Sequence, residues 1–168
     1  MPPAQITPAT SSPKLTYAAR LFAEYARSIA PIAGASLAQQ GFDAELACLP
    51  GKYAAPRGVI VLGLLDALPV ACAALRPLDA VDPTAGCDVA EVKRMYVQPH
   101  ARGLGVGRAM MESLFAFARS AGYRVLKLDT SAEMTGAIGL YTAMGFVRCQ
   151  RYNEDPDPTT LWFEHRLG

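Results

Sequence analysis

The sequence has few cysteines, and their positions exclude two kinds of structure. The 168-residue chain contains Cys48, Cys72, Cys87 and Cys149, far apart and without the short spacings typical of metal sites. We therefore predict no metal site and no disulfide framework. The N-terminus also lacks a basic start followed by an apolar segment, so no secretory signal is evident. Together these absences favour a reducing compartment, the cytoplasm.

The chain also lacks an excess of charge of either sign. It has 16 basic and 15 acidic residues, a formal net charge of +1. A nearly neutral chain gives no electrostatic argument for nucleic acid or an anionic membrane as a partner. Residues 59–75 are mostly apolar, but Asp66 and Pro69 interrupt them. Two buried strands joined by a tight turn explain this run better than a membrane span.

The arrangement of apolar residues predicts one domain of mixed secondary structure. Residues 1–12 form a segment that we expect to be mobile at its start, with a short first strand at 5–7, and residues 13–168 form the domain. Apolar residues at helical spacing predict a helix from Pro13 to about Ala30, closed by Pro31 and Gly34. Further helices are predicted at 42–49, 105–121 and 135–144, and strands at 58–65, 69–75, 88–97, 125–128, 146–152 and 161–167. This order predicts an α/β (α+β) fold with a mixed sheet and helices on both faces.

One segment, residues 91–107, combines a strand, a glycine-rich turn and the start of a helix. The strand Glu91–Val97 is followed by Gly103, Gly105 and Gly107 at alternate positions. Amides at the start of a helix have no internal partners and carry partial positive charge. Glycine lets such a backbone adopt positive φ and approach a ligand closely. The segment therefore predicts a site for a phosphate or diphosphate group.

Two common phosphate-binding motifs do not fit this segment. A P-loop requires Lys-Ser/Thr after its last glycine, where this chain has Arg108-Ala109. A Rossmann fingerprint requires Gly-x-Gly-x-x-Gly near the start of a βαβ unit, whereas the spacing here is Gly-x-Gly-x-Gly and lies late in the chain. The pattern Arg-x-x-Gly-x-Gly at 102–107 instead resembles the coenzyme A loop of the GNAT superfamily of N-acetyltransferases.

Two further blocks strengthen the resemblance. Glu-x-Lys-Arg-Met-Tyr-Val stands at 91–97, and Leu140-Tyr141 followed by Gly145-Phe146 is similar to the family's Leu-Tyr-x-x-x-Gly-Phe. The three blocks cover residues 88–147. The resemblance implies a twisted mixed sheet of about six to seven strands whose fourth and fifth strands splay apart. It also implies acetyl-CoA as cosubstrate, a small-molecule or peptide amine as acceptor, and no metal.

The resemblance further implies a coenzyme site built mainly from main-chain groups. The Val97 amide would bond the thioester oxygen, and Arg102 would either contact a phosphate or pack its stem over the loop. Met134 stands where many family members have Asn, so a different coenzyme contact is expected there. The predicted coenzyme-binding residues are Met95, Tyr96, Val97, Arg102, Gly103, Leu104, Gly105, Val106, Gly107 and Arg108.

Two side chains are predicted to carry the chemistry. Glu91 resembles the glutamate that acts as general base in some family members, although Lys93 could instead pair with it in a structural ion pair. Strand alternation places Glu91, Lys93, Met95 and Val97 on one face. Tyr141 matches the tyrosine that protonates the leaving thiolate, with a half-buried core tyrosine as the alternative.

The acceptor is the least determined part of the prediction. The expected reaction is direct transfer in a ternary complex, by a monomer or a homodimer. A non-catalytic acyl-CoA sensor is the main alternative, and retention of Glu91 and Tyr141 argues against it. Family precedent suggests the following acceptor contacts: Glu24, Tyr25, Tyr53, Arg57, Arg76, Tyr152 and Asn153.

Overall fold

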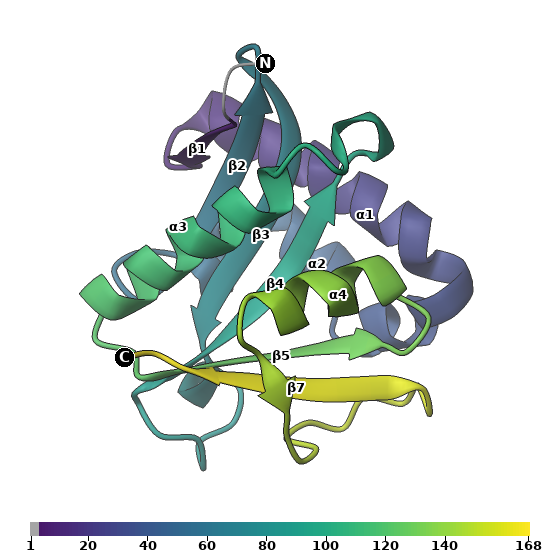
Figure 1. Ribbon diagram of the computed structural model, residues 1–168, viewed down its shortest axis with the longest axis vertical. Coiled ribbons are helices and arrows are strands. Elements are labelled where there is room, and N and C mark those ends of the chain that lie inside the picture. Colours follow the sequence, from purple (N-terminus) through teal and green to yellow (C-terminus); the bar gives the residue numbers. More distant parts are fainter. Residues whose placement is uncertain (1–3) are drawn as a thin grey trace.

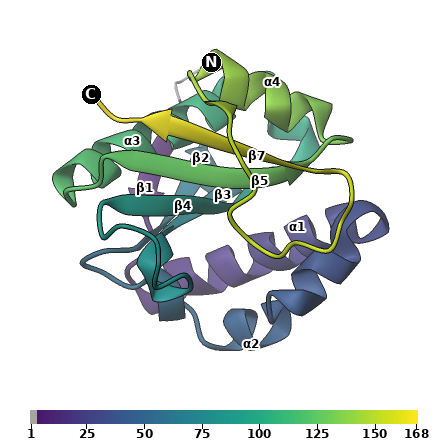
Figure 2. The same ribbon diagram turned by 90° about the horizontal axis from the view of Figure 1, so that it is seen from below.

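The computed structural model describes residues 4–168, and within them a seven-stranded sheet lies between two layers of helices (Figure 1). The strand order is β1-β2-β3-β4-β5-β7-β6. Helices α3 and α4 cover one face and α1 and α2 the other (Figure 2). The predicted mixed sheet with helices on both faces is therefore confirmed. The expected mobility of the first residues concerns residues 1–3, which lie outside the described part.

The elements follow the predicted order, with differences at several ends. The strands are β1 (Gln5–Pro8), β2 (Val59–Leu65), β3 (Leu68–Pro77), β4 (Val89–Val97), β5 (Val125–Ser131), β6 (Val147–Arg148) and β7 (Thr160–Arg166). The helices are α1 (Ser12–Gln39), α2 (Phe42–Ala47), α3 (Val106–Ser120) and α4 (Thr135–Ala143).

The apolar run at 59–75 forms an antiparallel pair, β2 and β3, as predicted. Asp66 and Ala67 make the turn between them with φ of 48° and 65°. No helix among residues 4–168 has both the length and the hydropathy that a bilayer span requires. The run is apolar because both faces of the central sheet are covered by helices.

Strands β4 and β5 separate after a short parallel contact, which confirms the predicted splay. They pair only from Val89 to Glu91 and from Val125 to Lys127. Beyond these residues the facing edges of the two strands have no strand partner in the described sheet.

A β-bulge in β4 corrects the prediction that Glu91, Lys93, Met95 and Val97 share a face. The register with β3 shifts between Lys93, which lies opposite Ala74, and Tyr96, which lies opposite Cys72. The bulge contains Arg94, whose φ is +58°. Because one extra residue reverses the alternation, Met95 and Val97 pack toward α3 and α4, while Tyr96 packs toward α1.

Helix α1 is longer than predicted. Pro31 and Gly34 were expected to close it, but it continues to Gln39 with non-helical angles at Ala33 (φ −130°, ψ 25°). A proline inside a helix removes one hydrogen bond and bends the axis without always ending the helix. The second half of α1 adds a buried Ser36 beside the splay.

The predicted strand at 146–152 was also wrong in extent, because β6 contains only Val147 and Arg148. The chain then leaves the sheet and runs past its edge toward α1, which Figure 2 shows as the long yellow connection before β7. The Ser36 hydroxyl donates to Asp155 over 2.7 Å, and Gln39 donates to the Glu154 carbonyl. This segment, residues 149–159, therefore borders the splay from the other side.

Candidate active site

A groove runs between the glycine turn before α3 and the start of α4. Its volume of about 580 Å³ is in the range of small-ligand sites. All of the predicted coenzyme-binding residues except Leu104 line it, and Leu104 is 42% exposed. The facing wall consists of residues 133–137 and Leu140, and so includes Met134.

The glycine turn offers unpaired amides to this groove. Among residues 4–168, no backbone acceptor pairs with the amides of residues 103–108, and the first helical bond of α3 is from Ala109 to Gly105. Gly103 and Gly105 have φ of +75° and +80°, which explains the glycines at these positions. Successive free amides at a helix N-terminus form a concave site for a phosphate group.

The end of β4 also directs backbone groups into the opening. The Gln98 amide donates to the Val70 carbonyl of β3 over 2.9 Å. Because amides along a strand alternate in direction, the amide and carbonyl of the preceding Val97 point away from β3, toward the splay. The carbonyl accepts a hydrogen bond from Arg102 Nε at 3.0 Å. The Arg102 side chain is therefore hydrogen-bonded to the backbone at the end of β4.

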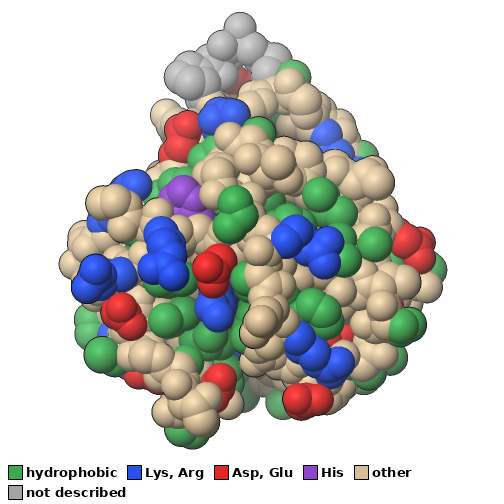
Figure 3. All heavy atoms as spheres, turned by 60° about the horizontal axis from the view of Figure 1, so that its bottom comes forward, with side chains coloured by type: hydrophobic (Ala, Val, Ile, Leu, Met, Phe, Trp, Pro, Cys, Tyr) green, Lys and Arg blue, Asp and Glu red, His purple; other side chains and the backbone are tan. Residues whose placement is uncertain are grey.

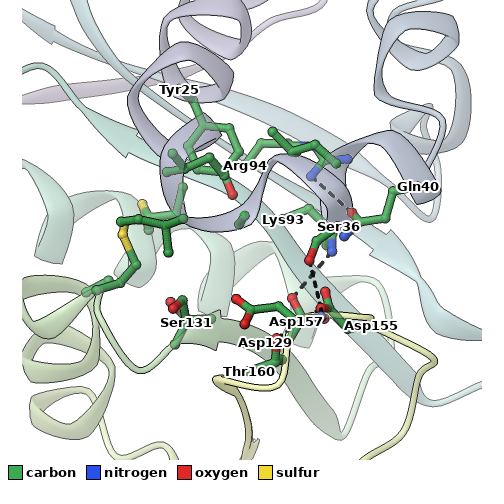
Figure 4. Close-up of a pocket in the computed structure, with 18 of the residues that line it drawn as sticks. Tyr25, Ser36, Gln40, Lys93, Arg94, Asp129, Ser131, Asp155, Asp157 and Thr160 are labelled. Carbon is green, nitrogen blue, oxygen red and sulfur yellow. Dashed lines mark hydrogen bonds and ion pairs between the residues drawn. The ribbon is translucent and has the colours of Figure 1, made fainter.

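A second space lies in the splay itself, and we call it the splay cavity (Figure 4). Its volume is about 70 Å³. Side chains of α1, β4, β5, α4 and the segment that leads into β7 line it. Four residues border both the groove and the splay cavity, and they mark the place where the two meet: Tyr25, Met95, Met134 and Ala137.

Tyr141 lines the splay cavity from α4 and is 6% exposed. Its ring lies 5.9 Å from that of Phe146, so the Leu-Tyr-x-x-x-Gly-Phe block also has a packing role. Burial raises the pKa of the Tyr141 hydroxyl, and Tyr25 and Asp129 add to the effect. The phenol therefore keeps its proton at neutral pH.

Glu91 is buried within a network of ion pairs. Its carboxylate accepts from Arg76 at 2.7 Å and from the Tyr152 hydroxyl at 3.0 Å, and it lies 3.6 Å from Lys93 Nζ. Burial alone would raise the pKa of Glu91, but Lys93 and Arg76 outweigh it and lower the pKa below the usual value. The carboxylate borders a separate pocket with Arg76 and Tyr152 rather than the splay cavity. Of the two predicted roles, these contacts favour the structural ion pair over the general base.

Asp129 is the carboxylate of β5 that does line the splay cavity. It lies 3.6 Å from Lys93 Nζ and accepts a hydrogen bond from Asn153. Although burial opposes it, the negative charges of Asp129 and Glu91 raise the pKa of Lys93. These contacts were not predicted from the sequence, because only the fold brings β4, β5 and residues 153–160 together.

The predicted acceptor contacts are dispersed in the structure. Tyr25 lines the splay cavity, whereas Arg76, Tyr152 and Asn153 line the pocket beside Glu91. Tyr53 is buried and donates to Glu45. Arg57 pairs with Asp79, and Glu24 accepts from Gln98. The side chains missed from the sequence were those contributed by the continuation of α1 and by residues 155–160.

The surface shows mixed charge rather than a field of one sign. On the face in Figure 3, basic and acidic side chains are interspersed with apolar ones.

Among residues 4–168, no group of His, Cys, Asp and Glu has the arrangement of a metal site.

Comparison with known proteins identifies the family. A model described as the acetyltransferase (GNAT) family matches residues 22–146. An uncharacterized N-acetyltransferase of Schizosaccharomyces pombe is 30% identical over 136 residues, 80% of each chain. The IAA acetyltransferase of Azospirillum brasilense is 38% identical over 99 residues, 58% of this chain and 61% of that protein.

Solved structures show the same fold. An acetyltransferase from Streptococcus agalactiae matches with a TM-score of 0.74 and 20% identity, over 99% of this chain and 100% of that one. An acetyltransferase from Salmonella typhimurium, solved with its cofactor acetyl-CoA, matches with a TM-score of 0.70 and 15% identity, over 99% and 95%. The chain therefore belongs to the GNAT family of acetyltransferases, which confirms the resemblance seen in its sequence.

Proposed function

We propose that the protein transfers an acetyl group from acetyl-CoA directly to an amine, within a ternary complex. One observation carries the proposal: the groove with unpaired amides meets the splay cavity at Met95. A diphosphate on the amides of residues 103–108 would leave the thioester arm free to follow the groove toward this junction. An amine in the splay cavity would then meet the thioester at the end of β4.

The proposed chemistry needs few protein groups. Bound acetyl-CoA supplies an activated acyl group. The amine nitrogen forms a bond to the acyl carbon, the carbon–sulfur bond breaks, and the amine loses a proton to a base or water. The Val97 amide, directed into the splay, is placed to donate to the developing oxyanion. Tyr141 gives its proton to the departing thiolate and is reprotonated from solvent.

The two alternative functions, a nucleotide-phosphate enzyme and a non-catalytic acyl-CoA sensor, would each require a different site. A nucleotide-phosphate enzyme would place a lysine side chain on the phosphates, whereas Arg108 and Ala109 follow the last glycine here. A sensor of acyl-CoA would need no second cavity beside the thioester position. The presence of Tyr141 in that cavity favours turnover over sensing.

Acetyl-CoA is expected to raise the melting temperature, and NAD and ATP are not. A ligand at 100 times its Kd stabilises by about 2.7 kcal/mol, or about 5–10 °C for a chain of this size. Differential scanning fluorimetry measures the shift, and free coenzyme A serves as the positive control. An equal shift with ATP would contradict the assignment.

Glu91→Gln is expected to lower the melting temperature while the pH profile of kcat/KM keeps its shape. The physical reason is that the variant leaves Arg76 and Lys93 without their buried carboxylate. Melting curves and initial rates from pH 5 to 9 measure the two effects separately. A loss of about 10²–10⁴-fold in kcat/KM with intact stability would instead make Glu91 the base.

We also propose the cytoplasm as the compartment, because all four cysteines are free thiols.

A further inference from the structure

The pocket beside Glu91 is separate from the two spaces that we assign to acetyl transfer. Its volume is about 630 Å³, in the range of small-ligand sites. None of the residues that line it also lines the groove, and among residues 4–168 only Gln40 borders both this pocket and the splay cavity. A ligand in this pocket would therefore occupy a site distinct from that of acetyl-CoA.

One cation in the pocket wall, Lys52, belongs to an ion-pair cluster that lacks a negative charge. Lys52 lies 2.8 Å from the Glu45 carboxylate, and Arg94 lies 2.7 Å from the same carboxylate. No other carboxylate of residues 4–168 pairs with either cation, so the three side chains carry one positive charge in excess. The Lys52 side chain is 25% exposed and that of Arg94 is 1% exposed, so the excess charge is most accessible at Lys52.

Arg76 adds a second cation to the wall, and one of its nitrogens is unused. The residue is 8% exposed, and both Nε and Nη2 donate to Glu91 Oε2. Nη1 has no hydrogen-bond partner among residues 4–168 and is not one of their enclosed unpartnered atoms, so it is open to the pocket. Because native structures rarely leave the donors of a buried guanidinium unmet, Nη1 indicates an acceptor group on a ligand.

The two cations are close enough for their charges to interact. Burial lowers the pKa of Lys52, and the hydrogen bond to Glu45 does not fully offset this effect. The positive charge of Arg76 lowers the pKa of Lys52 further. An anion that contacts both Lys52 and Arg76 would compensate this repulsion.

The three carboxylates of the pocket do not prevent an anion from binding there. Glu91 is already neutralised by the cations that it contacts. Glu154 pairs with Arg151 at 3.2 Å. Asp82 accepts from the amide and the hydroxyl of Thr84, and it is half-exposed, so water and salt screen its charge. The excess positive charge of the wall is therefore available to a ligand.

The rest of the wall indicates that the anion has a hydrocarbon part. Leu78, Val81 and Pro83 line the pocket together with the cations. Val81 is 51% exposed, and an apolar group of a ligand would remove its side chain from water. A carboxylate with a short hydrocarbon chain matches both the cations and the apolar residues, whereas inorganic phosphate matches only the cations.

We propose that the pocket beside Glu91 binds a small organic carboxylate. The carboxylate contacts Lys52 Nζ and Arg76 Nη1, and the hydrocarbon part contacts Leu78 and Val81. Neither the groove nor the splay cavity takes part, so this site is independent of the proposed function.

Three probes test the proposal: pentanoate, 1-aminopentane and inorganic phosphate. Each is titrated into the nitrogen-15-labelled protein at pH 7, and the amide resonances of residues 78–82 and 152–154 are followed by NMR. We expect pentanoate to shift these resonances with a Kd of about 1–10 mM, and 1-aminopentane to leave them unchanged. Phosphate should bind there about tenfold more weakly, because it gains nothing from the apolar residues.

Three results of these titrations would overturn the proposal. They are equal shifts with 1-aminopentane and pentanoate, binding of phosphate at least as tight as that of pentanoate, and no shift at these residues with any probe. Shifts confined to residues 103–108 would also overturn it, because they would place the anion on the glycine turn instead.

Lys52→Gln tests the cation itself. We expect the variant to weaken pentanoate binding about tenfold, because it loses one charge-assisted contact. Its amide spectrum should remain that of the folded protein, because Glu45 keeps its contact with Arg94. Lys14→Gln, which changes a lysine near the other end of α1, is the control and should leave the Kd unchanged. An unchanged Kd in Lys52→Gln would remove Lys52 from the site.

Val81→Ser tests the apolar side of the site without changing any charge. Because the residue is half-exposed, the substitution should not disturb the fold, and we expect pentanoate to bind about threefold to tenfold more weakly. Pentanoate binding with the wild-type Kd would contradict the contact with the hydrocarbon part. These titrations contain no acetyl-CoA, so a negative result leaves the proposed acetyl transfer unaffected.

Discussion

Replacing Tyr141 by Phe is expected to lower kcat by about 10²–10⁴-fold, the contribution of a general acid, and to leave the Kd of acetyl-CoA near the wild-type value. Tyr141 lines the splay cavity, which meets the groove at Met95, and the raised pKa of its hydroxyl keeps it protonated. Phenylalanine retains the contact with Phe146 and loses only the proton donor. Steady-state rates and calorimetric titration with acetyl-CoA measure the two quantities.

Tyr17→Phe is a suitable control, because this tyrosine of α1 is 41% exposed. It should leave both kcat and Kd unchanged. A Tyr141→Phe variant with wild-type kcat would remove Tyr141 from the role of acid and leave it as a core tyrosine. A large change in Kd would show that the hydroxyl contributes to binding instead.

Replacing Glu45 by Gln is expected to destabilise the fold by about 3 kcal/mol, close to the cost of leaving buried cations unpaired. The carboxylate of Glu45 on α2 lies 2.7 Å from Arg94 Nη2 and 2.8 Å from Lys52 Nζ. It also accepts a hydrogen bond of 2.7 Å from the Tyr53 hydroxyl. The Arg94 side chain is 1% exposed, so solvent cannot replace the lost charge. Urea unfolding at pH 7 measures the difference, with Asp43→Asn on the same helix as the control.

The pH dependence of the free energy of unfolding is a second test of the ion pair between Glu45 and Arg94. Burial would raise the pKa of Glu45, but the hydrogen bond and charge of Arg94 outweigh it and lower the pKa to about 2. A carboxylate with a lowered pKa stabilises the fold fully above its unfolded value, near pH 4.5, and this stabilisation is lost as the pH falls toward 2. The wild type should therefore lose about 3 kcal/mol between pH 5 and 2 that the Glu45→Gln variant does not lose. Parallel pH curves would contradict the importance of this pair.

The sequence alone was sufficient to predict those properties that depend on a short stretch of chain. Gly103 and Gly105 predicted positive φ and a helix N-terminus, and both are present. The apolar run at 59–75 predicted two buried strands, because covered faces and a tight turn leave a clear pattern. The family resemblance also came from short motifs, since main-chain recognition of a coenzyme needs few side chains.

The tertiary structure alone decided which side chains face which cavity. The bulge at Arg94 separates Met95 and Val97 from the face of Glu91, and the Arg94 side chain pairs with Glu45 of α2, which is distant in the sequence. Pro31 was expected to end α1, yet packing of the second half keeps it helical and brings Ser36 to Asp155. The lining of the splay cavity arises from such contacts between segments far apart in the sequence, and periodicity within one segment carries no information about them.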